Sequence, residues 1–393
     1  MISGKVKLIL DMGNSETRGR VKFGVDSDGM MREGKFTLSN VFSKVEDANY
    51  VVPADYTTAD STMFTIPAVQ IGNGEVAGTY VNGNICATEF SSTTIRPTAL
   101  DKKYNLQTTP LTFALAILKA TEIVADMAKV SNLNELDLMW DVSILLPPAE
   151  KDKGLAEMTR IVKSINHIDY KFPEVSLDIR VDNVVIYPEG FCAFIGAVFT
   201  RGMKIRQGME KWLQDTVLVQ DIGAGTTDRM IIKGGRVISD SLDSSQIGGN
   251  QVTQAVKRRL RKDLDLPLPD EEILQGVITG VVRDGSKLVD ISKIVIQAKK
   301  DVATQEVNEL TDYFEDLNYP MRTISGILAC GGGTLESENP SIPPLSDVML
   351  GFLETLMPNS ELLELPKDKN GVPISPRELN IEGASILCEA NNK

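Results

Sequence analysis

The sequence predicts an α/β protein with two domains. Its 393 residues are too many for one ordinary hydrophobic core. They suit two cores, each burying about 70% of its unfolded surface. Predicted strands and helices alternate along the chain, which is the pattern of α/β layers. The third observation is a repeat, because one strand, glycine turn and strand unit occurs near residue 11 and again near residue 221.

Composition narrows the classes of function. Hydrophobic residues make up 42% and charged residues 24%, so the chain should fold throughout. A net charge of −13 would repel a phosphate backbone, so we expect no direct nucleic-acid binding, although a basic partner protein stays compatible. Four scattered cysteines and one histidine exclude a zinc cluster of soft ligands and favour a reduced, cytoplasmic protein. No signal peptide or membrane span is visible, so we expect no membrane association.

The first copy of the repeat begins with an apolar strand at residues 6–10. The turn DMGNS (residues 11–15) follows, and a second strand comes at residues 21–23. In the second copy, DIGAGTTD (residues 221–228) lies between strands at 216–220 and 230–232. Aligned without gaps, the copies share three residue pairs: Asp11 with Asp221, Gly13 with Gly223, and Thr17 with Thr227.

The other elements follow from periodicity and end signals. We expect helices at residues 111–128, 150–164, 190–199, 248–263, 291–314 and 380–387, the last one returning to the body. We expect strands at residues 138–145, 183–187 and 323–329, the last one followed by a third glycine turn, GGGT (residues 331–334). Residues 25–96, rich in Thr, Asn and Gly, predict an irregular small subdomain, and residues 366–376 predict an exposed loop.

The glycine turns are candidates for phosphate binding. Residues without bulky side chains let backbone N–H groups approach a phosphate closely. Such positions, with the hydroxyls that can add hydrogen bonds, are Gly13, Gly223, Gly225, Ser15, Thr226 and Thr227. A single Asp-x-Gly turn indicates little, since Asp and Gly are common hairpin residues. Two copies and a third glycine turn together favour a nucleotide site.

Four segments resemble the motifs of the actin, heat-shock chaperone and sugar kinase superfamily. DMGNS and DIGAGTT resemble its two phosphate motifs, PEG (residues 188–190) its first connecting motif, and GGG (residues 331–333) its adenosine motif. Within the superfamily, residues 11–20 and NIEG (residues 380–383) are most similar to ParM-type plasmid-segregation actins.

The resemblance implies a two-lobed actin-like (ribonuclease H-like) fold, with a duplicated βββαβα core and a nucleotide cleft between the lobes. Domain I would span residues 1–190, with a small subdomain at about 25–100 and a returning C-terminal helix at 378–393. Domain II would span residues 191–377, with a small subdomain at about 255–300.

The resemblance also implies roles for single residues. Asp11 and Asp221 would hold Mg²⁺ through its water shell, since Mg²⁺ binds by one or two carboxylates plus phosphates, although each Asp could simply cap its turn. Glu189 would orient the attacking water, or else cap a helix. Arg18 stands where actins and ParM carry a lysine that contacts the β-phosphate. A guanidinium can serve phosphate as well, unless Arg18 is only an exposed arginine.

The implied cofactors are ATP (or GTP) and Mg²⁺, with Glu189, Asp11 and Asp221 as the catalytic group. The implied nucleotide-binding residues are Gly13, Asn14, Ser15, Thr17, Arg18, Gly223, Ala224, Gly225, Thr226, Thr227, Gly331, Gly332, Gly333 and Thr334.

The expected function is therefore that of a cytomotive filament protein. It would bind and hydrolyse ATP, polymerise with copies of itself, and segregate plasmid DNA through a DNA-binding adaptor of the ParR type. Two alternatives share the fold. A small-molecule kinase of the sugar type would need an acceptor pocket, for which the sequence has no distinct signature. A chaperone-type or division-type ATPase is the other alternative, but the sequence has no recognisable substrate domain or membrane-binding tail.

Overall fold

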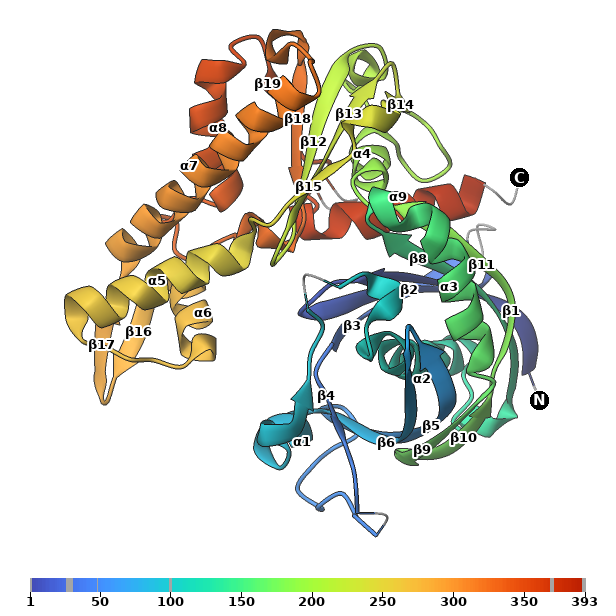
Figure 1. Ribbon diagram of the computed structural model, residues 1–393. Coiled ribbons are helices and arrows are strands. Elements are labelled where there is room, and N and C mark those ends of the chain that lie inside the picture. Colours follow the sequence, from blue (N-terminus) through green and yellow to red (C-terminus); the bar gives the residue numbers. More distant parts are fainter. Residues whose placement is uncertain (1, 26–30, 48, 99–100, 368–370, 391–393) are drawn as a thin grey trace. The chain divides into compact units, whose positions relative to one another are not determined.

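The computed structural model describes residues 2–25, 31–47, 49–98, 101–367 and 371–390 (Figure 1). The chain divides into two compact units, Met1–Pro188 (unit 1) and Glu189–Lys393 (unit 2).

Unit 1 is built on a sheet in the order β11-β8-β1-β2-β3. Its strands are β1 (Ile2–Met12), β2 (Glu16–Val25), β3 (Met31–Ser39), β8 (Leu136–Leu146) and β11 (Arg180–Pro188). The strands β1, β2 and β3 form an antiparallel meander, whereas β8 and β11 run parallel to β1. Parallel neighbours need crossover connections. The helices α2 (Thr108–Ala128) and α3 (Lys151–Ser164) provide them. These elements confirm the predicted hairpin, helices and strands of this region.

A second sheet of unit 1 replaces the irregular subdomain that we expected at residues 25–96. Its order is β10-β9-β5-β6-β4-β7. Its strands are β4 (Phe42–Lys44), β5 (Ser61–Ile71), β6 (Gly74–Gly83), β7 (Thr94–Ile95), β9 (His167–Phe172) and β10 (Glu174–Asp178). The prediction was wrong because β5 pairs with β9, a strand about 100 residues later, which local composition cannot reveal. Within this span, residues 26–30 and 48 lie outside the described residues.

One core joins the two sheets of unit 1. The helix α2 lies between them, and its apolar residues share a cluster with both sheets (Figure 1). The remaining short helices of the unit are α1 (Asn84–Thr88), η1 (Ser91–Thr93), η2 (Lys103–Asn105), η3 (Leu133–Glu135) and η4 (Pro148–Glu150).

Unit 2 repeats the plan of unit 1. Its sheet runs β14-β13-β12-β18-β19, and β15 pairs with β13. The strands are β12 (Thr216–Ile222), β13 (Thr227–Lys233), β14 (Arg236–Val237), β15 (Asp243–Ser245), β18 (Gly326–Cys330) and β19 (Glu361–Leu362). As in unit 1, the first two strands form a hairpin, the third strand is antiparallel to the second, and two later strands run parallel to the first. The duplicated α/β core is therefore confirmed.

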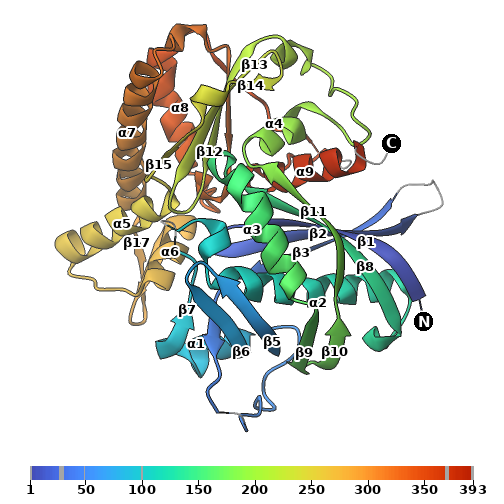
Figure 2. The same ribbon diagram turned by 45° about the vertical axis from the view of Figure 1, so that its right-hand side comes forward.

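Helices cover both faces of this sheet, α4 and α9 on one face and α7 and α8 on the other (Figure 2). Successive residues of β12 alternate between the two cores: Val217 and Val219 face α4 and α9, whereas Leu218 faces α7 and α8. The helices of the unit are α4 (Phe191–Val198), α5 (Gly249–Leu264), α6 (Asp270–Thr279), α7 (Ser292–Asp316), α8 (Leu345–Leu356) and α9 (Leu379–Ala390).

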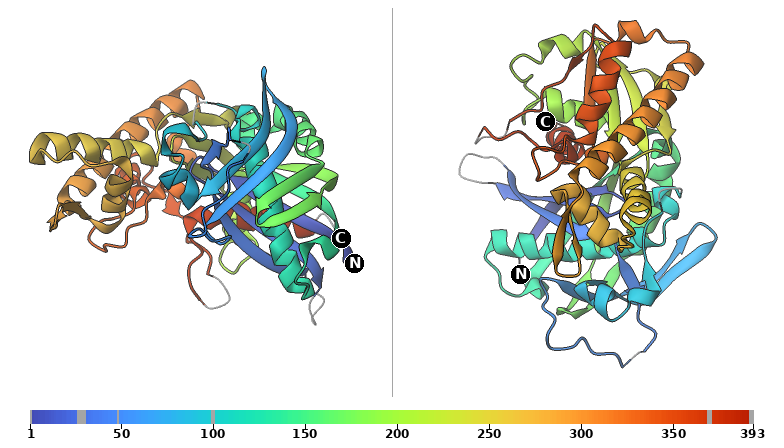
Figure 3. Two further views of the ribbon diagram at one scale, coloured as in Figure 1. Left: turned by 90° about the horizontal axis from the view of Figure 1, so that it is seen from below. Right: turned by 90° about the vertical axis from the view of Figure 1, so that its left-hand side faces the viewer.

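Four helices of unit 2 were predicted from the sequence and are confirmed: α4, α5, α7 and α9. The helix α8, which lies alongside α7, and the helix α6 were not predicted (Figure 3). Neither was the hairpin of β16 (Val281–Asp284) and β17 (Lys287–Asp290). The remaining short helices are η5 (Glu210–Leu213), η6 (Ser239–Ser241), η7 (Met321–Thr323), η8 (Gly332–Thr334) and η9 (Pro376–Glu378).

Three details complete the fold. The strand predicted from residue 323 begins later, at Gly326, because η7 precedes it. The loop predicted at residues 366–376 is exposed at 371–373 but buried at both end prolines, and residues 368–370 lie outside the described residues. Within the described ranges, no helix combines the length and apolar character needed to cross a membrane.

Candidate functional site

The turn between β1 and β2 is closed by its own backbone. The N–H of Gly13 donates to the carbonyl oxygen of Glu16 at 3.0 Å. A Cβ atom at residue 13 would lie 2.8 Å from that oxygen, too close for any residue but glycine. Asp11 pairs across the hairpin with Arg18, and the turn carries Asn14, half-buried, and Ser15, exposed.

A buried asparagine that the sequence did not point to holds this first turn. Asn40 donates from Nδ2 to the Gly13 carbonyl at 2.5 Å, and its Oδ1 accepts from the Thr17 hydroxyl at 2.9 Å. Its backbone N–H donates to the Ser15 carbonyl at 3.2 Å. Thr17 is fully buried, so its hydroxyl supports the turn from behind. Asn40 lies 27 residues from Gly13, beyond the reach of a local motif.

Arg18 is mostly buried. Its side chain is 14% exposed and forms an ion pair with Glu16, the residue whose carbonyl closes the turn. The guanidinium thus stays close to the backbone of the first turn.

The turn between β12 and β13 repeats the geometry of the first turn. The N–H of Gly223 donates to the Thr226 carbonyl at 2.7 Å, which is the same bond three residues apart. Ala224 and Gly225 lie between them. The next residue, Thr227, is fully buried like Thr17, and its hydroxyl donates to the Ile247 carbonyl at 2.7 Å. The repeat seen in the sequence is therefore a repeat of backbone structure.

Three glycine segments of unit 2 meet at the second turn. The N–H of Gly249 donates to the Gly223 carbonyl at 3.0 Å, and the N–H of Asn250 donates to the Ala224 carbonyl at 2.7 Å. From the third turn, a Cβ atom at Gly333 would lie 1.9 Å from the Gly223 oxygen. There is no room for side chains at these glycines, so three backbone segments contact one another directly.

The third glycine turn also lies beside Asp221. A Cβ atom at Gly331 would lie 2.4 Å from Asp221 Oδ1. The turn is closed by the buried Thr334 hydroxyl, which donates to the Gly331 carbonyl at 3.0 Å. Gly332 is half-buried and faces the side chain of Arg377.

Asn380 of α9 connects Asp221 to the turn that carries Glu189. Its Oδ1 accepts from the N–H groups of Gly190, at 2.9 Å, and Ala193, at 3.1 Å. Its Nδ2 donates to Asp221 Oδ2 at 2.5 Å. Glu189, 7% exposed, precedes Gly190 directly. The sequence placed Asn380 in a motif but assigned it no role, since its partners lie 159 to 190 residues away.

Within unit 2 the structure thus brings together Glu189, Asp221, the second turn and the third turn. The candidates of the first turn lie together in unit 1. Tight turns that present backbone N–H groups suit phosphate, and a carboxylate at a strand end suits a hard cation with its water shell. Asp11 and Asp221 each lie at the end of a strand that leads into such a turn, and each by itself offers the hard oxygen ligand that Mg²⁺ prefers.

Part of unit 2 matches a known protein family. Residues 219–339, which include the second and third turns, match the family described as archaeal actin homologue MreB-like, C-terminal. No curated protein matches the chain.

Solved structures resemble the whole chain. The archaeal actin homologue Ta0583 aligns with a TM-score of 0.64 at 14% identity, covering 99% of this chain and 100% of that one. ParM of Bacillus thuringiensis with AMPPNP aligns with a TM-score of 0.62 at 13% identity, covering 99% of each chain. ParM in a 15-stranded filament from Clostridium botulinum aligns with a TM-score of 0.61 at 13% identity, covering 98% of this chain and 99% of that one. The chain has the actin-like fold.

Proposed function

We propose that the chain is a cytomotive actin-like ATPase: it binds ATP (or GTP) with Mg²⁺, polymerises with copies of itself, and hydrolyses the nucleotide. The observation that carries the proposal is the repeated turn, in which Gly13 and Gly223 close the same backbone hydrogen bond at equivalent points of two equivalent sheets. Duplicated turns of this kind suit the two ends of a phosphate chain. ParM with AMPPNP and ParM in a filament both share the fold.

In this proposal each turn offers backbone N–H groups to the phosphates. Arg18 adds a cation beside the first turn, and Asp11 and Asp221 hold Mg²⁺ through water. The metal ion would neutralise phosphate charge. Glu189 orients the attacking water, a task that needs one polar group aligned with the γ-phosphate. The backbone approach at Gly331, Gly332 and Gly333 provides a surface for the ribose and base.

We further propose that the filament segregates plasmid DNA through a DNA-binding adaptor of the ParR type, in the cytoplasm. With a net charge of −13 the protein itself should not bind duplex DNA at physiological salt. Gel shifts with protein alone should show no complex at low micromolar concentration. A salt-sensitive shift without any adaptor would contradict this expectation.

One experiment separates the proposal from its alternatives. Light scattering, pelleting and phosphate release are followed after adding Mg-ATP or Mg-GTP, beside a parallel assay for phosphate transfer to sugars. We expect assembly that depends on nucleotide and phosphate release that follows it. Transfer to a sugar without assembly would favour the small-molecule kinase. Hydrolysis without assembly or transfer would indicate another ATPase of this fold.

A further inference from the structure

The helix α7 carries two charged side chains, Lys299 and Glu306, that are fully buried. They are seven residues apart, two helical turns, so they point to the same side of the helix. Burial of a charge is costly unless the charge is paired or hydrogen-bonded. Glu306 contacts Ser245, which lies three residues before Gly248, and Lys299 contacts Leu335, the residue after the third turn.

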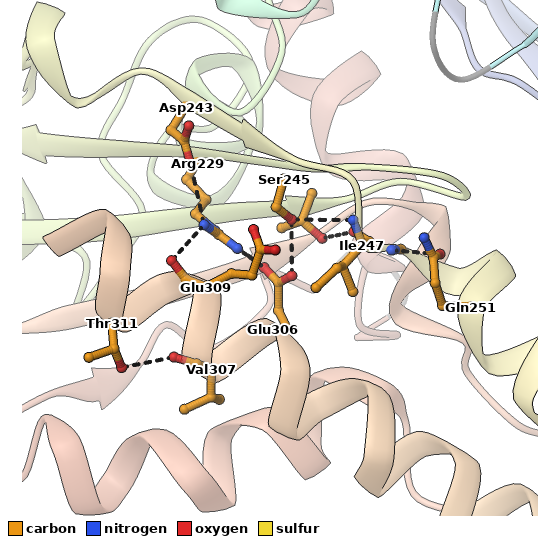
Figure 4. A network of polar contacts seen from close by, with 11 residues as sticks. Arg229, Asp243, Ser245, Ile247, Gln251, Glu306, Val307, Glu309 and Thr311 are labelled. Atoms are coloured by element: carbon orange, nitrogen blue, oxygen red, sulfur yellow. Dashed lines mark hydrogen bonds and ion pairs between the residues drawn. The ribbon is translucent and has the colours of Figure 1, made fainter. Parts of the chain in front are cut away.

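Glu306 connects two strands through the two oxygens of its carboxylate (Figure 4). Its Oε1 accepts from Nη2 of Arg229, on β13, at 2.6 Å, and from Nε at 3.2 Å. Its Oε2 accepts from the hydroxyl of Ser245, on β15, at 3.0 Å. Burial raises the pKa of Glu306, while the Arg229 guanidinium opposes that shift. Arg229 also contacts Asp243 at 3.3 Å.

The network continues from Ser245 to the second turn. Residues 243–249, here called the strap, run from β15 to the start of α5. Within the strap, Ser245 Oγ accepts from the Ile247 N–H at 3.4 Å, and the Ile247 carbonyl accepts from the Thr227 hydroxyl at 2.7 Å. The strap ends where Gly249 donates to the carbonyl of Gly223.

Lys299 makes the corresponding connection to the third turn. Its Nζ donates to the carbonyls of Leu335, at 2.9 Å, and Pro343, at 2.8 Å. Leu335 directly follows the turn at 331–334 and has a φ of 52°, so its conformation needs support from its surroundings. The helix α7 therefore contacts the strap through the Ser245 hydroxyl, and it contacts the segment after the third turn through two backbone carbonyls.

We propose that Glu306 and Lys299 are positioning residues, through which α7 holds the strap and the third glycine turn against the second turn. Stability alone does not explain the buried Arg229–Glu306 pair, because apolar residues of similar volume often stabilise a core as well. That this arrangement serves a bound nucleotide rests on the proposed function. The holding of the strap itself is independent of any ligand.

The test removes one hydroxyl. Ser245→Ala deletes the link between Glu306 and the strap, and Thr311→Ala is the matched control. Thr311 lies on α7, as Glu306 does, and its hydroxyl donates to the Val307 carbonyl of that helix at 2.9 Å (Figure 4). Hydrogen–deuterium exchange of nucleotide-free protein should be about fivefold faster or more in the strap of Ser245→Ala, and unchanged there in Thr311→Ala. Mg-ATP affinity, measured by calorimetry, should fall about tenfold in Ser245→Ala only.

A double variant separates positioning from stability. Arg229→Met with Glu306→Met replaces the ion pair by apolar side chains, so its melting temperature should stay within about 5 °C of wild type. Its strap should nevertheless exchange faster, and its Mg-ATP affinity should fall about tenfold, because no carboxylate holds Ser245.

The outcomes are distinct. Wild-type exchange rates in the strap of Ser245→Ala overturn the proposal. If the strap loosens but Ser245→Ala and the double variant both keep wild-type nucleotide affinity, the link between the strap and nucleotide binding is overturned. If the strap loosens as expected but wild-type protein binds no nucleotide, the strap's support by α7 stands and the proposed function fails.

Discussion

Asn380 uses both ends of its side-chain amide at once. The oxygen accepts hydrogen bonds from two backbone N–H groups at the start of α4, and the nitrogen donates a hydrogen bond to the Asp221 carboxylate. A carboxylate side chain could supply the acceptor but not the donor, and a hydroxyl could not span all three partners. One side chain thereby fixes the turn of Glu189 relative to Asp221. In unit 2, Glu189 is the candidate for hydrolysis and Asp221 is the candidate for metal binding.

Two substitutions of Asn380 should therefore differ in how their effect on stability depends on pH. Asn380→Ala loses all three bonds and should cost about 1–3 kcal/mol of unfolding free energy at every pH. Asn380→Asp places a second carboxyl against Asp221, so like-charge repulsion raises a folded-state carboxyl pKa above its unfolded value. Binding of a proton to that carboxyl therefore stabilises the folded variant at low pH, and this contribution to the unfolding free energy is lost as the pH rises through the folded-state pKa. Urea unfolding at pH 4.5 and pH 8 measures this, and a pH dependence equal to that of Asn380→Ala would refute the contact.

Glu189 should affect hydrolysis rather than assembly. Glu189→Gln keeps the size of a nearly buried side chain but removes its charge. We expect phosphate release to slow by about 100-fold while Mg-ATP affinity and pelleting stay near wild type. Filaments should persist longer, since the population stays in the triphosphate-bound state. Glu174→Gln, on the surface strand β10, is the control. Normal phosphate release by Glu189→Gln would make Glu189 a turn residue only.

At the scale of elements, the sequence predicted the hairpins and helices that depend on neighbouring residues. The hairpins at residues 11–15 and 221–228 followed from glycine turns between apolar strands, and α2 and α7 followed from helical spacing. The β5–β9 pairing and the contact of Asn380 with Asp221 join segments about 100 or more residues apart, so no local pattern encodes them. Of the candidate site, the three glycine turns were thus predictable, whereas Asn40, Asn380 and the network on α7 were not.

The buried lysine of α7 should give the protein a distinctive alkaline behaviour. Burial lowers the pKa of Lys299 from 10.5 to about 8. Because the folded pKa is the lower one, the unfolded chain binds more protons between about pH 8 and pH 10.5. The contribution of Lys299 to stability therefore rises across that window. Lys299→Met should lack this rise, so its unfolding free energy relative to wild type should fall from pH 8 to pH 10. Chemical denaturation at both pH values measures the difference, with the exposed-face Lys300→Met as control. A difference in unfolding free energy that stays constant between the two pH values would mean that the pKa of Lys299 is not lowered in the folded protein.

At the scale of the whole molecule, each unit contributes one copy of the same turn and the same strand-ending aspartate. In the proposed function, Asp11 and Asp221 act on one Mg²⁺ ion. In the alternative reading each aspartate serves its own turn. The two readings differ in how the two sites depend on each other, which a double-mutant cycle measures.

Asp11→Asn and Asp221→Asn each keep the shape of the side chain and remove the charge. If the two carboxylates share one ion, each single variant should lose about 10–100-fold in Mg-ATP affinity. The fold loss in Mg-ATP affinity of the double variant should be smaller than the product of the two single losses, because each single variant already weakens the hold on the shared ion. Without Mg²⁺, with chelator present, all of the variants should bind ATP alike. The exposed Asp47→Asn in unit 1 and Asp240→Asn in unit 2 are the controls. Calorimetry with and without Mg²⁺ decides the matter: multiplicative losses that persist in chelator would show that each aspartate only caps its own turn.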